Sequence, residues 1–171
     1  MLASFMDALS VRGMRNHYHP GTFDAVRRGH PLHHFSCVLP LGRAEFLPSA
    51  LTLYERYAEE LDARYERICF TVKACDLDRG SLRIVSGEDG DPEQVIAFVQ
   101  RCARTFGLTG LWGFHWSQGC VFPSFDAFGG AACLLDLGEQ RVVDRIDCRR
   151  WLSDRIARDM KPAARVVRHH S

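Results

Sequence analysis

The stretch GLWGFHWSQGCVFPSFDAFGGAACLLDLGEQRVVDRIDCRRW, residues 110–151, is the part of the chain richest in large apolar side chains mixed with glycine. Near its start, large rings alternate with smaller or polar residues. A strand here would therefore place Trp112, Phe114 and Trp116 on one face. A face of three large rings needs a second layer of structure to cover it. The stretch predicts the innermost strand of a sheet that is backed by helices.

The second half of this stretch predicts a hairpin and a closing helix. Residues 131–137 and 141–146 have the composition of strands, and Gly138-Glu139-Gln140 lies between them as a turn. Asp147 is placed to cap a following helix, in which we expect Trp151 and Leu152 to be buried. The sheet is thus expected to gain a C-terminal β-hairpin and a helix.

Two other segments predict amphipathic helices. In residues 45–64 the apolar positions fall at helical spacing, at Leu47, Leu51, Tyr54, Ala58 and Leu61. In the second segment they are Val95, Ile96, Val99, Ala103 and Phe106. Asp91-Pro92-Glu93-Gln94 predicts the start of the second helix, with Gln94 closing a capping box, and Gly107 predicts its left-handed end.

The order of these elements predicts a ferredoxin-like fold. Strands are expected in residues 33–41, 68–73 and 82–84, so that the central order is strand, helix, strand, strand, helix, strand. That order is the split βαβ arrangement, an antiparallel α+β sheet with two helices on one face. We expect an irregular arm in residues 1–30, a single α+β domain in 31–160 and a flexible basic tail in 161–171.

Composition limits the classes of protein to consider. The chain has 171 residues, 46% of them hydrophobic, which suits one soluble domain with a sizeable core. A net charge of +1 argues against a protein that grips a polyanion with its whole surface. The seven cysteines are an odd number, which favours buried thiols in a reducing cytoplasm over a disulfide framework. No apolar run is long enough for a membrane span.

One resemblance concerns the aromatic strand. The element Trp112-Gly113-Phe114-His115-Trp116, followed after a break by Phe128-Gly129-Gly130, resembles a family of small uncharacterised ferredoxin-like proteins carried on plasmids and phages of Gram-negative bacteria. The likeness covers residues 90–152, and it departs where those proteins tend to have Lys or Thr beside the second Trp. It implies a ferredoxin-like fold and a mobile-element setting, without an activity.

A catalytic reading of the sequence rests on His115, Cys120 and Asp126. In thiol-dependent hydrolases a histidine activates the thiol, and a carboxylate orients the histidine. These three residues lie close together in the sequence, whereas catalytic triads usually draw on distant segments. The alternative is that His115 lies on the face opposite the rings and that Cys120 fills a gap.

A metal-binding reading rests on His17 and His19, which lie two residues apart in the irregular arm. A structural zinc site needs four ligands, so further residues from elsewhere would have to join this pair. Solvated histidines are the alternative. We expect no metal and no other cofactor.

A nucleic-acid reading uses the aromatic strand as a stacking platform. Trp112, Phe114 and Trp116 would stack on bases of RNA or single-stranded DNA. The phosphate contacts would come from Arg141, Arg145, Arg149 and Arg150. No RNA-recognition signature accompanies these residues, and a row of rings in register is also typical of a protein core.

Among these readings the sequence favours non-catalytic binding over an enzyme. We expect a cytoplasmic accessory protein of a mobile genetic element that docks on a host protein or a protein–nucleic-acid complex. It would use the open sheet face or the arginine-bearing C-terminal region. Inhibition of a host defence system is one form of this function. The nucleic-acid module is the second hypothesis, and the thiol-dependent hydrolase is the third.

Overall fold

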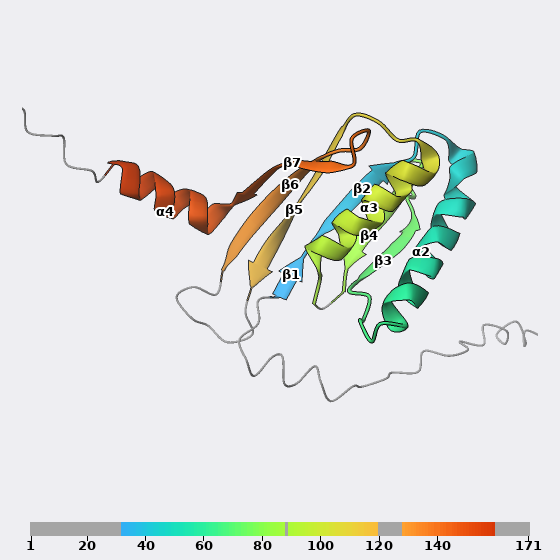
Figure 1. Cartoon of the computed structure of the whole chain (residues 1–171), viewed down its shortest axis with the longest axis horizontal. Coiled ribbons are helices and arrows are strands. Elements are labelled where there is room, and N and C mark those ends of the chain that lie inside the picture. The colour runs from blue at the N-terminus through green and yellow to red at the C-terminus, as the bar shows by residue number, and fades with distance from the viewer. Residues whose placement is uncertain (1–31, 88, 120–127, 160–171) are drawn as a thin grey trace, which may run out of the picture. The chain divides into compact units, whose positions relative to one another are not determined.

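The computed structural model of the chain describes residues 32–87, 89–119 and 128–159 (Figure 1). Its strands are β1 (Leu32–His34), β2 (Ser36–Pro40), β3 (Phe70–Ala74), β4 (Ser81–Ser86), β5 (Leu111–Gly119), β6 (Gly129–Asp136) and β7 (Arg141–Asp147). Its helices are the short 3-10 helix η1 (Ala44–Phe46) and the α-helices α2 (Leu47–Asp62), α3 (Pro92–Phe106) and α4 (Cys148–Asp159). The fold is therefore α+β, as the sequence predicts. The predicted arm 1–30 and tail 161–171 lie outside the described residues.

The strands form two antiparallel sheets, where the sequence predicts one. One sheet has the order β1-β5-β6-β7, and the other has the order β2-β4-β3. The predicted continuous strand 33–41 is interrupted at Phe35, where the chain changes its partner from β5 to β4. There the Phe35 N–H donates to the hydroxyl of Ser86 at 3.1 Å, and the Phe35 carbonyl accepts from the Ser86 N–H at 3.0 Å. A side-chain hydroxyl thus replaces one strand–strand hydrogen bond at the junction.

The core lies between the strands and the helices α2 and α3, which lie side by side across the strands (Figure 1). α3 contributes the largest share, because Val95, Phe98, Val99 and Cys102 are fully buried. Phe98 has ring contacts with two tyrosines of α2 and with Phe70 of β3, at centroid distances of 5.7–5.9 Å. This ring cluster joins both helices to the outer strand.

The ends of α3 are capped much as its sequence predicts, with one correction. Asp91 is the N-cap, and its Oδ1 accepts from the Glu93 N–H at 2.8 Å. Gln94 does not close a capping box: its Oε1 instead accepts from the Cys69 N–H at 3.0 Å. The Gln94 Nε2 also donates to the carbonyl of Arg67 at 3.0 Å, so both ends of the side-chain amide bind the segment before β3. Gly107 ends the helix with φ 63°, in the left-handed region that favours glycine.

α4 forms where the sequence places it, but its burial was predicted wrongly. The Asp147 carboxylate accepts from the Arg150 N–H at 2.9 Å, which confirms the predicted cap. Trp151 and Leu152, however, are 56% and 53% exposed. None of the described elements covers this side of α4. The helix is thus attached to β7 by its first turn, with its apolar side chains facing solvent.

Candidate functional site: an exposed C-terminal strand and helix

The three aromatic side chains of β5 belong to the core. Trp112, Phe114 and Trp116 are 8%, 5% and 5% exposed, and neighbouring rings lie 5.4 and 5.3 Å apart between centroids. The Trp112 indole N–H donates to the carbonyl of Val38 at 2.8 Å, and Phe35 covers Phe114 at 5.8 Å. In this arrangement the rings offer bases no open face to stack on, so the structure does not support their predicted role as a platform.

This burial predicts how the three tryptophans of the chain behave in fluorescence. A Trp151→Phe variant retains only Trp112 and Trp116, and we expect blue-shifted emission that acrylamide hardly quenches. The wild-type protein should show an additional, readily quenched component from Trp151, because that ring is more than half exposed. Addition of a single-stranded oligonucleotide to the variant should leave its emission unchanged. Strong quenching by the oligonucleotide would instead support the nucleic-acid hypothesis.

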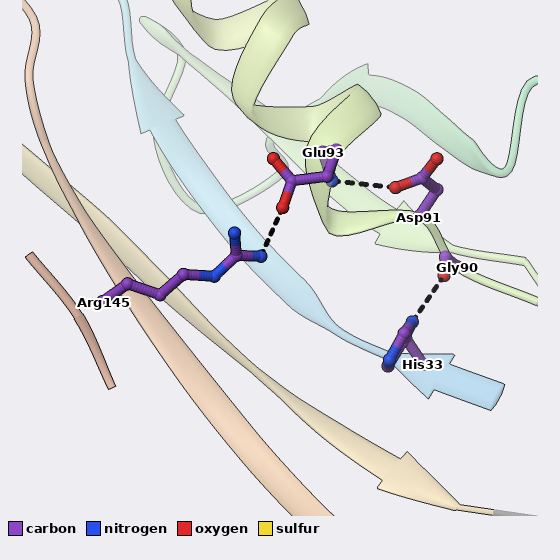
Figure 2. Close-up of polar contacts among 5 residues, drawn as sticks. All are labelled: His33, Gly90, Asp91, Glu93 and Arg145. Carbon is purple, nitrogen blue, oxygen red and sulfur yellow. Dashed lines mark hydrogen bonds and ion pairs between the residues drawn. The ribbon is translucent and has the colours of Figure 1, made fainter. Parts of the chain in front are cut away.

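Arg145, one of the four predicted phosphate-binding arginines, is engaged within the protein. Its guanidinium forms an ion pair with Glu93 at the start of α3 (Figure 2) and lies 5.2 Å above the centroid of the Trp116 ring. Close by, the ring Nδ1 of His33 lies 3.3 Å from the carbonyl oxygen of Gly90. These contacts tie β7 and β1 to the segment that begins α3. Arg145 therefore has a structural role in this arrangement.

The other three predicted arginines do not form one patch. Arg141 lies at the start of β7, whereas Arg149 and Arg150 lie at its far end, in the first turn of α4. The Arg149 side chain packs against Gly129, where an added Cβ would meet its Cδ at 3.0 Å. Arg150 is exposed, and its Nε lies 4.0 Å from a carboxylate oxygen of Asp154. The arginines of the C-terminal region are thus spread along it.

The structure places only one member of the proposed catalytic triad. His115 is exposed on the face of β5 opposite the tryptophan rings, as the structural alternative predicted. Cys120 and Asp126 lie outside the described residues. His115 does share a surface cavity of about 310 Å³ with Cys133 and Asp144. Cys133 is only 3% exposed, and burial raises the pKa of its thiol, which disfavours the thiolate that a nucleophile needs.

A second cavity, of about 630 Å³, lies where β2 leads into η1 and where α3 leads into β5. Its walls are mainly apolar and include Phe46, Phe106 and Trp112. Arg43 is the one titratable side chain among its described lining residues, and the guanidinium lies 5.8 Å over the Phe46 ring. The described lining of this cavity therefore offers no pair of groups for proton transfer.

The described thiols predict a sharp order of reactivity. Burial raises the pKa of Cys37 and of Cys102 to about 12, whereas Cys148 is exposed in α4. At neutral pH we expect a thiol reagent to label Cys148 first. Cys37 and Cys102 should remain unlabelled until the protein unfolds. Mass mapping of each modified cysteine measures this order. The same map gives the rate at Cys120, and labelling there far ahead of Cys148 would revive the hydrolase hypothesis.

The predicted metal pair His17 and His19 lies outside the described residues. Within the part of the chain that the structure describes, no group of three or more histidine, cysteine or carboxylate side chains could hold a metal ion.

The most unusual surface is formed by β7 and α4. Every residue of β7 is exposed, including the apolar side chains of Val142, Val143 and Ile146 at 40–44%. Residues 148–158 of α4 are exposed as well, and Ile156 joins Trp151 and Leu152 at 50–56%. Contiguous exposed apolar side chains are uncommon on monomeric proteins and are typical of interaction sites.

Comparison with known proteins does not assign this surface to a family. Within the described residues, no α-helix has the length and apolar character that a membrane span requires. No protein-family model matches the chain, and no curated protein or solved structure matches it either.

Proposed function

We propose that this chain is a non-catalytic binding protein that docks through α4 on an acidic surface of a host protein or protein–nucleic-acid complex. The observation that carries the proposal is the half-exposure of Trp151, Leu152 and Ile156 on one helix. Tryptophan in particular is enriched among the residues that dominate binding energy at interfaces.

The spacing of these residues suits a helix that binds in a groove. Trp151, Leu152 and Ile156 follow Cys148 by three, four and eight positions, so all four share one face of α4. Such a stripe is what an amphipathic helix presents to an apolar groove of its partner.

The charge of α4 supports a partner with carboxylates or phosphates beside that groove. In sequence the helix carries four arginines and two aspartates. One of the aspartates, Asp154, lies beside Arg150 on the helix surface. The net positive charge would draw an acidic rim towards the helix and steer its approach.

The wider setting belongs to the same proposal. We propose that the order β2-α2-β3-β4-α3-β5 is a ferredoxin-like split βαβ arrangement, with β6, β7 and α4 added. The resemblance of the aromatic strand to plasmid and phage proteins supports an accessory role in a mobile genetic element, acting in the host cytoplasm. Inhibition of a host defence system is the concrete form of this role that we favour.

A capture experiment with matched variants tests the docking role. The full chain is immobilised, exposed to a lysate of a Gram-negative host, and compared with a variant carrying Trp151→Ser, Leu152→Ser and Ile156→Ser. We expect the wild type to retain a specific protein or complex. The variant should retain at least tenfold less of that partner. Each apolar side chain buried in a groove contributes on the order of 1.5 kcal/mol or more, and tenfold corresponds to about 1.4 kcal/mol.

The control variant carries Leu77→Ser and Leu111→Ser, which remove apolar side chains that are 98% and 67% exposed outside α4. It should capture the same partner as the wild type. Raising the salt concentration should weaken capture, because the arginines contribute to it. Equal capture by the α4 variant, or no retained partner with the wild type, would refute docking through α4.

A further inference from the structure

The cavity of about 630 Å³ between the ends of β2 and α3 has the volume of a small-molecule site. Two loops border it, one after β2 and one before β5, and they lie close together (Figure 1). Gly42 in the first loop and Gly107 in the second have φ of 75° and 63°, which glycine tolerates best. At both positions no described atom lies within 4 Å of an added Cβ, so both backbones border open space.

Hydrogen bonds between distant segments hold the two loops in place. In the first loop the Leu41 N–H donates to the carbonyl of Gly80 at 2.8 Å. In the second loop the Gly110 carbonyl accepts from the N–H of Leu137 at 2.9 Å. The cavity is therefore formed without a ligand, as is usual for small-molecule sites.

Aromatic rings form much of the apolar wall. Phe46 of η1 and Phe106 of α3 are stacked, with ring centroids 5.1 Å apart and an interplanar angle of 28°. Trp112 of β5 lines the same cavity, and its indole N–H is already bound to a carbonyl of β2. Aromatic rings pair favourably with a further ring in offset or edge-on contact. The wall therefore favours a ligand with an aromatic body.

The charge of the cavity favours a ligand with a single negative charge. Arg43 is the one titratable side chain in the described lining, which thus lacks a carboxylate for a cation and a second base for a nucleotide. The Arg43 guanidinium forms no ion pair with any described residue, and it lies 5.8 Å over the ring of Phe46. A guanidinium without another partner can bind a carboxylate through two parallel hydrogen bonds. One carboxylate therefore complements this site.

We propose that the cavity binds a small aromatic monocarboxylate, with its ring against Phe46, Phe106 and Trp112 and its carboxylate paired with Arg43. This inference goes beyond docking through α4, because it assigns a different kind of ligand to another part of the molecule. Since the described lining offers no pair of groups for proton transfer, the ligand is bound and released unchanged.

Isothermal titration calorimetry of the full chain with 2-naphthoate, a two-ring monocarboxylate, tests this site. We expect one molecule to bind per chain, with a Kd in the micromolar range. 2-Naphthamide has the same rings without the charge, so it should bind at least tenfold more weakly. Decanoate keeps the carboxylate but replaces the rings by an alkyl chain, and it should also bind more weakly. Absence of naphthoate binding, or tighter binding of decanoate than of naphthoate, would overturn the proposal.

Variants and spectra assign the binding to this cavity. Arg43→Gln should weaken naphthoate binding at least tenfold and leave naphthamide binding unchanged, because only the acid pairs with the guanidinium. The matched control, Arg83→Gln, removes the same charge from an exposed position on β4 and should bind naphthoate like the wild type. In a proton–nitrogen correlation spectrum, naphthoate should shift the indole signal of Trp112 but not that of Trp151. Equal weakening of acid and amide by Arg43→Gln, or a shift confined to Trp151, would refute binding at this site.

Discussion

Replacement of Phe98 by alanine should lower the free energy of unfolding by about 3–5 kcal/mol, the usual range for a large aromatic side chain removed from a packed core. Phe98 has no exposed surface, and it lies at the centre of the ring cluster that joins α3 to Tyr54, Tyr57 and Phe70. The cavity left by the ring would border both helices and β3, so no single element could close it by a small shift. Because small domains are stable by only about 5–15 kcal/mol, this substitution would remove a large part of the total stability.

Urea denaturation followed by circular dichroism measures this loss, with Phe128→Ala as the matched control. Phe128 is 73% exposed, so the same chemical change there should alter the unfolding free energy by no more than about 0.5 kcal/mol. If Phe98→Ala were as mild as Phe128→Ala, the packing of α3 against α2 and β3 described above would be incorrect. An unchanged dependence on urea concentration in both variants would show that the comparison concerns stability alone.

The sequence predicts the elements of this fold well where a periodic pattern coincides with a clear start or stop signal. α3 is the best example, because Asp91, Pro92 and Gly107 frame a stripe in which Val95, Ile96, Val99 and Ala103 are buried, and only Phe106 at its end is partly exposed. The alternation of rings in β5 likewise predicts a strand with one buried face, as observed. Both signals are local, and local signals need no knowledge of neighbouring elements.

Two features of the fold depend on contacts between distant segments, and local sequence patterns do not predict them. The change of partner at Phe35 depends on the Ser86 hydroxyl, which lies fifty-one positions away in the sequence. No local sequence pattern indicates the ion pair between Arg145 and Glu93, because β7 and α3 come together only in the folded protein.

The candidate site was missed in part because apolar side chains are expected inside. Trp151 and Leu152 have the helical spacing of a buried stripe, and spacing alone cannot tell whether the cover comes from the same chain or from another. The described fold supplies no such cover on this side of α4. The same pattern that predicts a core therefore becomes the strongest indication of a binding surface.

Replacement of Gly90 by alanine should also be strongly destabilising, by about 3 kcal/mol, at the upper end of the range for overpacking. A Cβ at Gly90 would lie 2.5 Å from the carbonyl oxygen of His33, 2.7 Å from Cε1 of Phe35 and 2.8 Å from the Cβ of Ser86. The Gly90 N–H donates to that same His33 carbonyl at 3.0 Å, so the two backbones cannot separate without losing this bond. The clash falls where β1 passes into β2, and relief of it would disturb both sheets.

Thermal and urea unfolding of Gly90→Ala should be compared with Gly87→Ala, three residues earlier in the same connection. The nearest atom to a Cβ at Gly87 is 3.8 Å away, which is ordinary van der Waals contact. Alanine there should be neutral, or stabilising by up to about 1 kcal/mol, because it reduces the freedom of the unfolded chain. The two substitutions are chemically identical, so a large difference isolates close packing at the junction as the cause. Equal stability of the two variants would mean that the backbone of Gly90 lies farther from His33 and Phe35 than described.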